Sequence, residues 1–203
     1  MSRLIRSVGP CRIELSPERS PCEALVSAVA HQQLTGRVAQ VILGRFFALY
    51  PGRCFPDPQA ILDTPLETLR SVGFSRAKAA AIQDIAAKTL AGVVPSSKRI
   101  LSMNDDEVID QLTQVRGVGR WTVEMLLIFT LGRPDVWPVD DYGIRKGFAR
   151  AYGQKELPKP NELREFGERW RPFRSTAAWY FWRAADELTP VIPPRRRAQK
   201  KES

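Results

Sequence analysis

A tight glycine turn between two apolar helices is the clearest indication of chemistry in this sequence. Residues 112–123 read Leu-Thr-Gln-Val-Arg-Gly-Val-Gly-Arg-Trp-Thr-Val, so a helix runs into the turn 117–119 and a second helix is expected over 124–130. Glycines leave backbone N–H groups accessible, and the positive N-terminal end of the second helix favours an anion such as a DNA phosphate. The alternative is an ordinary helix–helix corner with a C-cap glycine.

The net charge is compatible with a polyanionic partner. The chain has 31 Lys and Arg against 22 Asp and Glu, which gives a formal charge of +9. Residues 195–203 carry +4 of this charge and leave +5 for the body, and we expect this basic tail to be disordered. Many basic proteins bind no nucleic acid, so the charge alone leaves the function class open.

Four segments together resemble the helix-hairpin-helix superfamily of DNA glycosylases, and more narrowly the 3-methyladenine-DNA glycosylase II family. The similarity extends over about residues 20–188 and is carried by segments 30–35, 115–122, 138–142 and 170–175. The resemblance implies base excision repair, in which the enzyme flips an alkylated base such as 3-methyladenine or 7-methylguanine out of duplex DNA and hydrolyses its N-glycosidic bond.

The resemblance places the essential aspartate of the family on Asp141, in the segment Pro-Val-Asp-Asp-Tyr. A carboxylate stabilises the positive charge that develops on the sugar as the bond to the base lengthens, and it can orient or deprotonate water. Asp140 and Asp141 could both be simple helix caps. We assign capping to Asp140 and catalysis to Asp141.

The residue after Arg120 separates two chemistries in the superfamily that this chain resembles. Bifunctional members have a lysine there, whose amine forms a Schiff base and leads to strand cleavage. This sequence has Trp121, which cannot attack the sugar. The resemblance therefore implies a monofunctional hydrolase without lyase activity. Lys146 and Lys78 are the nearest other lysines, and we expect both to be solvated on the surface.

Two tryptophans are expected to hold the damaged base. Trp182 matches the aromatic pocket position of the family, and Trp121 is the second candidate; Tyr142, next to the acid, is a further candidate wall. An indole face attracts a cationic base by about 0.5–2 kcal/mol, which favours bases alkylated at N3 of adenine or N7 of guanine. Tryptophans in helical proteins more often belong to the core, and we expect this of Trp170 and Trp179.

Base flipping requires a residue that fills the vacated stack. The resemblance places this residue on Gln33, with Leu34 as the apolar alternative, although a glutamine here could equally cap a helix. His31 is expected to be a structural or minor-groove neighbour rather than a catalytic base.

Phosphate contacts are expected from the hairpin residues Gly117, Val118 and Gly119, from Arg120, and with help from Lys78. Such contacts do not depend on DNA sequence and weaken with salt.

No cofactor is expected to be required. Superfamily hairpins often hold a monovalent cation, Na⁺ or K⁺, and the resemblance maps its carbonyl ligands to Thr113, Val115 and Val118. The spacing of the three cysteines fits no iron–sulfur cluster and favours reduced, structural thiols.

Helix-start signals predict the elements that position these residues. Ser20, Thr64 and Asn104 each begin a capping-box pattern, and Ser75 is a further N-cap. A helix over 35–50 is expected to face the core with Val38, Val41, Ile42, Phe46 and Leu49. Because alternation typical of strands is hard to find, we expect an all-α fold with little or no β-structure: a two-lobed helical bundle with a helix-hairpin-helix DNA-binding motif.

The chain is expected to form a single glycosylase unit over 1–203, with one lobe made by about 1–34 and 154–194 and the other by 35–153. Fewer than twenty residues precede Ser20, so we expect a minimal form without the additional N-terminal domain of larger family members.

The chain has no signal-peptide core and no apolar membrane span, so we expect a cytoplasmic, nucleoid-associated monomer that binds double-stranded DNA containing damaged bases. A glycosylase for another damaged or deaminated base, or a non-catalytic helix-hairpin-helix DNA-binding module, is the alternative.

Overall fold

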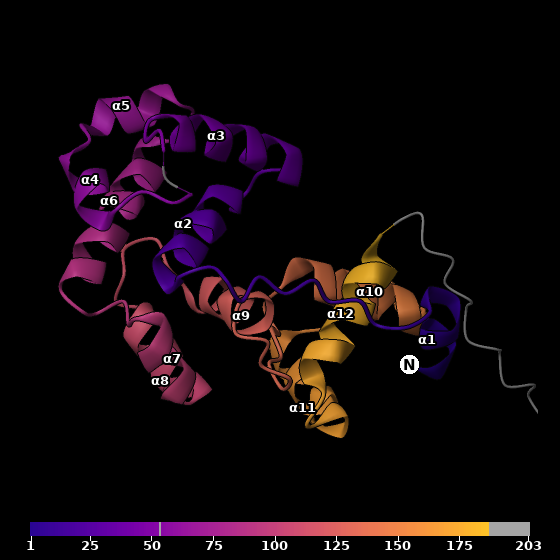
Figure 1. Cartoon of the computed structure of the whole chain (residues 1–203). Helices are drawn as coiled ribbons and strands as arrows, with labels where there is room; N and C mark the ends of the chain where they lie inside the picture. Colours follow the sequence, from indigo (N-terminus) through magenta and orange to yellow (C-terminus); the bar gives the residue numbers. More distant parts are fainter. Residues whose placement is uncertain (53, 187–203) are drawn as a thin grey trace, which may run out of the picture. The chain divides into compact units, whose positions relative to one another are not determined.

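The computed structural model describes residues 1–52 and 54–186, and the regular secondary structure of this part is all helical, without a strand (Figure 1). The expected all-α class is therefore confirmed. The predicted basic tail lies outside the described residues. Within the described part, no helix is long and apolar enough to cross a membrane.

The helices divide into two compact units, formed by residues 15–132 and by residues 1–14 with 133 onward. The expected lobe boundaries at 34/35 and 153/154 were thus wrong. Packing explains the difference: α10 (Tyr142–Tyr152) packs extensively on α12 (Arg174–Ala185), whereas α2 (Pro21–His31) packs on α6 (Arg76–Leu90) and α9 (Arg120–Phe129).

The 15–132 unit, the hairpin unit, carries the glycine turn. Its remaining helices are α3 (Gly36–Ala48), α4 (Pro58–Asp63), α5 (Leu66–Ser71), α7 (Ser97–Ser102) and α8 (Asp105–Leu112). The N-caps predicted at Ser20, Ser75 and Asn104 are all confirmed, and Asn104 forms a complete capping box with Glu107. The predicted cap at Thr64 is wrong, because its hydroxyl donates to the Ala60 carbonyl and Pro65 precedes α5.

The predicted core face of helix α3 is confirmed only in part: Ile42 and Phe46 are buried as expected, and Leu49 is half-buried. Val38 and Val41 are 45% and 49% exposed, whereas Ala39, Ile42, Leu43 and Phe46 are buried. Apolar residues occur around much of this helix, so the sequence pattern did not define a single inward face.

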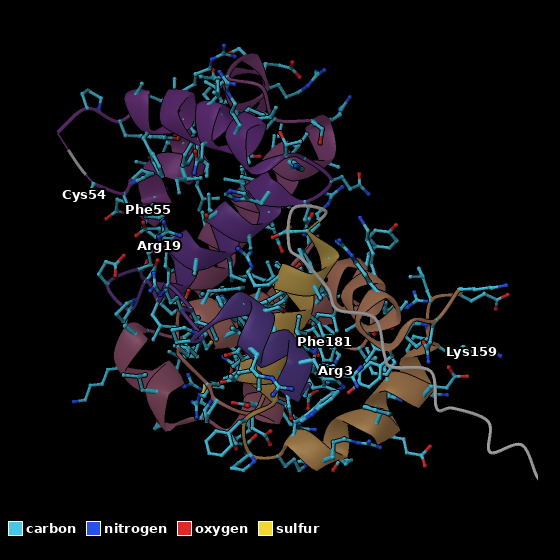
Figure 2. The ribbon with its side chains drawn as sticks, turned by 90° about the vertical axis from the view of Figure 1, so that its right-hand side faces the viewer. Arg3, Arg19, Cys54, Phe55, Lys159 and Phe181 are labelled. Carbon is cyan, nitrogen blue, oxygen red and sulfur yellow. The ribbon has the colours of Figure 1, made fainter. Side chains whose placement is uncertain are left out.

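The second unit, the acid unit, packs α1 (Ser2–Val8), α10, α11 (Pro160–Gly167), the 3₁₀ turn Glu168–Trp170 and α12 around an aromatic core. Phe181 is fully buried within this unit, whereas Lys159 points away from it (Figure 2). Trp170 and Trp179 are partly buried and pack against the core, as predicted, and Trp137 lies within it.

A close approach of α10 and α12 holds the acid unit together. A Cβ atom added at Gly147 of α10 would lie 1.8 Å from the carbonyl oxygen of Phe181 and 2.6 Å from its carbonyl carbon. Only glycine permits this contact between the two helix backbones.

We therefore expect Gly147→Ala to lower the free energy of unfolding by about 3 kcal/mol or more, because the two helices must move apart. Thermal or urea unfolding measures this change. Gly44→Ala is the matched control, because nothing lies within 4 Å of a Cβ at this exposed position of α3; it should stabilise by about 0.5–1 kcal/mol. Similar effects of the two substitutions would contradict the close approach.

An ion pair joins the segment that leads to α10 with the beginning of α12. Arg174 donates from Nε to Asp135 Oδ1 at 2.7 Å and from Nη2 to Oδ2 at 3.0 Å. Burial raises the pKa of Asp135, but the hydrogen bonds and charge of Arg174, with the charge of Arg171, outweigh it and lower that pKa below its ordinary value. Ser175 supports the same junction, since its hydroxyl donates to the Arg133 carbonyl at 2.6 Å.

Because the pKa of Asp135 is lower in the folded chain than in the unfolded chain, its stabilisation is complete above the unfolded pKa of about 3.9 and is lost as the pH falls through the folded pKa. We expect Asp135→Asn to lower the free energy of unfolding by about 1–3 kcal/mol at pH 6. The difference from the wild-type chain should shrink below about pH 4. Urea unfolding at a series of pH values tests this, and a difference that stays constant down to pH 3 would contradict it.

Candidate functional site

The acid unit holds Asp141 as the N-cap of α10. Its Oδ1 accepts the Ile144 backbone N–H at 2.7 Å and the Trp182 indole N–H at 2.8 Å, and the residue is only 8% exposed. The capping role assigned to Asp140 was therefore wrong: Asp140 is exposed, and Asp141 itself caps the helix. Two N–H donors therefore hold this carboxyl oxygen at the N-terminal end of α10.

Trp182 comes from α12, and its bond to Asp141 brings two of the predicted site residues together. Gly143 makes room for this pair, because a Cβ there would lie 2.9 Å from Trp182 Cδ1 and 3.1 Å from Asp141 Oδ1. The sequence analysis missed this glycine, which stands two residues after the predicted acid. Tyr142 adjoins the acid but is 66% exposed, so its predicted role as a pocket wall stays a prediction.

In the hairpin unit, the predicted glycine turn joins α8 to α9. Gly117 has φ +75° and lies against α6, where an added Cβ would be 3.0 Å from the Cβ of Ala81. Gly117 and Gly119 are exposed, whereas the Val118 side chain is buried and its N–H donates to the Val115 carbonyl at 3.1 Å. Val118 could therefore meet a ligand only through its remaining backbone atoms.

Helix α6 fixes the hairpin through side chains that the sequence analysis did not single out. The backbone N–H of Arg116 donates to Asp84 Oδ2 at 2.7 Å, and the Lys88 ammonium donates to the Gln114 carbonyl. No sequence motif indicates these contacts, because they join segments about thirty residues apart.

Arg120 begins α9 with an exposed side chain whose Nε donates to Glu124 Oε1 at 3.1 Å. Lys78 is not solvated as expected, and its predicted phosphate contact stays a prediction. Its ammonium donates to the carbonyls of Ala30 at 2.9 Å and Gln32 at 2.7 Å, and burial lowers its pKa. These bonds engage Lys78 within the protein rather than on a solvated surface.

Trp121 lines a pocket of about 310 Å³ that lies wholly within the hairpin unit. The other walls come from α2, α9 and their flanking residues, and they combine apolar and hydroxyl side chains with one guanidinium and one imidazole: Arg19, Ala24, Ser27, Ala28, His31, Met125, Leu126, Phe129 and Thr130. Arg19 is labelled in Figure 2. The volume is at the lower end of the range for ligand sites, about 300–1,000 Å³. Met125 and Phe129 were missed, although they follow Trp121 by four and eight residues and so lie on the same face of α9.

The predicted insertion residues lie in the turn between α2 and α3. Gln33 is exposed and has φ +57°, and among the described residues it is the one non-glycine residue with a positive φ. Leu34 is 39% exposed. The His31 ring nitrogen Nδ1 donates to the Ser27 carbonyl at 2.8 Å, which fits a structural role.

Comparisons with known proteins agree with this arrangement. The chain is 40% identical over 195 residues to DNA-3-methyladenine glycosylase 1 of Schizosaccharomyces pombe, which covers 94% of this chain and 86% of that protein. The solved structure of the Schizosaccharomyces pombe 3-methyladenine DNA glycosylase in complex with abasic DNA superposes with a TM-score of 0.85 at 39% identity, over 90% of this chain and 89% of that one.

A DNA-3-methyladenine glycosidase from Bacillus halodurans matches with a TM-score of 0.78 at 31% identity, over 92% of this chain and 85% of that chain. A family model matches residues 26–172, which include the turn between α2 and α3, the glycine hairpin and Asp141. The chain therefore belongs to the HhH-GPD superfamily of base excision DNA repair proteins.

Proposed function

We propose that this chain is a DNA glycosylase that excises alkylated bases, of the 3-methyladenine and 7-methylguanine type, from double-stranded DNA. The observation that carries the proposal is the buried carboxylate of Asp141, held by the α10 N-terminus and by the Trp182 indole N–H. Relatives that are named 3-methyladenine glycosylases over nearly the whole length of the chain support the choice of substrate.

The reaction begins when the enzyme binds the DNA backbone. The backbone N–H groups of the exposed Gly117 and Gly119 and the Arg120 guanidinium are suited to phosphate oxygens. Gln33 or Leu34, at the exposed turn after α2, fills the space that the flipped base leaves. None of these groups needs to read a base edge, so binding should be independent of sequence and sensitive to salt.

The chemical step is hydrolysis of the N-glycosidic bond. As this bond lengthens, its electron pair moves to the base, and a cationic methylated base leaves as a neutral molecule. The sugar becomes oxocarbenium-like, and the negative charge of Asp141 stabilises it. Water then adds its oxygen to C1′ and loses a proton, which the carboxylate can accept. The products are the free base and an abasic site.

Trp121 and Trp182 give the preference for alkylated bases in this proposal. Each indole face attracts a cationic ring by about 0.5–2 kcal/mol, whereas a neutral base gains less. A cationic alkylated base is also a better leaving group than a neutral normal base. A site that binds several different bases can therefore still leave the normal bases of DNA uncut.

A monovalent cation at the hairpin is part of the proposal. The turn places the carbonyls of Thr113, Val115 and Val118 within six residues, and the Val115 oxygen, which accepts one N–H, retains a second lone pair. Carbonyl oxygens are suitable ligands for Na⁺ or K⁺, and such an ion would add positive charge next to a bound phosphate.

The substitution Asp141→Asn tests the catalytic assignment sharply. An amide oxygen can still accept the Ile144 and Trp182 N–H groups, so the helix cap is kept while the charge is removed. We expect release of 7-methylguanine from methylated duplex to fall about 100-fold or more, with little change in affinity for an abasic duplex or in unfolding.

Undiminished release by Asp141→Asn would contradict the catalytic role of this carboxylate. Asp140→Asn is the matched control at the adjacent exposed carboxylate, and it should retain activity. Salt-dependent DNA binding by the wild-type chain without release of any base would instead support a non-catalytic module. Release of only a deaminated base would support the alternative function, a glycosylase for a base other than an alkylated one.

We also propose that the reaction stops at base removal. Trp121 has no amine, so the position after Arg120 cannot form a Schiff base. Sodium borohydride should trap no covalent protein–DNA adduct, and the product strand should stay intact until it is treated with alkali. An adduct that forms with the wild-type chain and disappears in Lys146→Met would contradict the monofunctional assignment.

A further inference from the structure

The turn between α2 and α3 is held by a side chain that reaches the DNA-binding hairpin. Gln32 donates from its amide Nε2 to the Gly117 carbonyl at 3.0 Å and to the Thr122 hydroxyl at 3.1 Å. Both acceptors lie at least 85 residues further along the chain, on the glycine turn and on the first turn of α9. The residue before the predicted insertion residue is therefore attached to the hairpin itself.

Lys78 of α6 holds the same turn from another direction. Its ammonium donates to the carbonyls of Ala30 and Gln32, so it satisfies the last turn of α2 where no glycine ends the helix. The lowered pKa of Lys78, which follows from burial, agrees with an ammonium that is enclosed by these carbonyls.

Gln33 lies directly after these anchors and has a left-handed backbone. For a residue other than glycine, this conformation costs about 1–2 kcal/mol and persists only where the surroundings fix it. The fixed points are the Gln32 side chain and carbonyl on one side and the bond from the Leu34 N–H to the His31 carbonyl, at 3.2 Å, on the other. The exposed Gln33 is thus presented by a turn that is already ordered.

We propose that Gln32 and Lys78 are positioning residues that hold the 32–35 turn, before DNA binds, in the conformation that inserts into the base stack. The inference rests on the proposed function and extends it to the flipping step. A flexible turn would lose conformational entropy when the duplex opens, and this loss would add to the free-energy cost of base flipping. A turn that is already ordered has lost this entropy on folding, so its insertion costs less.

The attachment to α6 makes the turn and the hairpin one rigid element. Lys78 holds the turn, and Asp84 and Lys88 of the same helix hold hairpin backbone groups. Binding of the phosphate backbone by the hairpin therefore also sets the place at which the turn meets the bases.

The test compares base release from paired and unpaired lesions in single-turnover reactions. One duplex carries 7-methylguanine opposite cytosine, and the other carries it opposite a tetrahydrofuran abasic analogue, where extrusion costs less. Gln32→Glu keeps the size of the side chain but replaces the donating amide with an acceptor, and Lys78→Met removes the ammonium. Gln32 is partly exposed, so its variant tests the proposal even if Lys78→Met folds poorly.

We expect each variant to release the paired lesion about ten-fold more slowly than the wild-type chain. This loss is of the size expected when the two hydrogen bonds of the Gln32 amide, or the two of the Lys78 ammonium, are removed. The unpaired lesion should be released at close to the wild-type rate. Lys78→Arg should recover part of the loss, because a guanidinium can also donate to two carbonyls.

Gln83→Ala is the matched control. Gln83 also lies on α6 and donates to a distant carbonyl, that of Thr64 at 2.9 Å, but it does not contact the 32–35 turn. Gln83→Ala should not slow release of the paired lesion more than release of the unpaired lesion. An equal loss on paired and unpaired lesions, or a paired-lesion loss no larger than that of Gln83→Ala, would overturn the positioning role. If the wild-type chain releases neither lesion, the proposed function fails and the inference fails with it.

Discussion

The hydrogen bond between the Trp182 indole and Asp141 Oδ1 is the interaction on which the proposed chemistry depends. It joins the beginning of α10 to the last turn of α12, and it fixes a carboxylate that would otherwise rotate about its side-chain bonds. The Ile144 N–H adds a second restraint on the same oxygen. In the proposed reaction, the carboxylate held in this way stabilises the oxocarbenium-like sugar.

The rest of the acid unit can be understood as the scaffold of this pair. Gly147 lets α10 and α12 approach backbone to backbone, and Gly143 leaves space for the indole next to the carboxylate. The ion pair of Asp135 and Arg174 fixes the segment that precedes the acid to the beginning of α12. In the hairpin unit, α6 has the corresponding role, because it carries the side chains that hold both the glycine turn and the turn after α2.

Short-range features of the chain were predicted well. The glycine hairpin, the caps at Ser20, Ser75 and Asn104, and the place of Asp141 at a helix beginning all depend on residues within a few positions of one another. Predictions of helix caps were wrong where two neighbouring residues, or two hydrogen bonds of one residue, were equally suitable. Asp140 and Asp141 are both suitable caps, and Thr64 has a capping pattern but donates to the Ala60 carbonyl instead.

The sequence by itself determined the helical class and the hairpin, because capping, turn formation and helical periodicity follow from neighbouring residues. The catalytic role of Asp141 was assigned through the family resemblance and stays a prediction. Only the tertiary structure decided which face of α3 is buried, where the two units divide, and that Lys78 holds the end of α2. It also decided the partners of Gln32 and Asp141. These contacts join residues 41 to 90 positions apart, and their energies depend on how whole helices pack rather than on any local pattern.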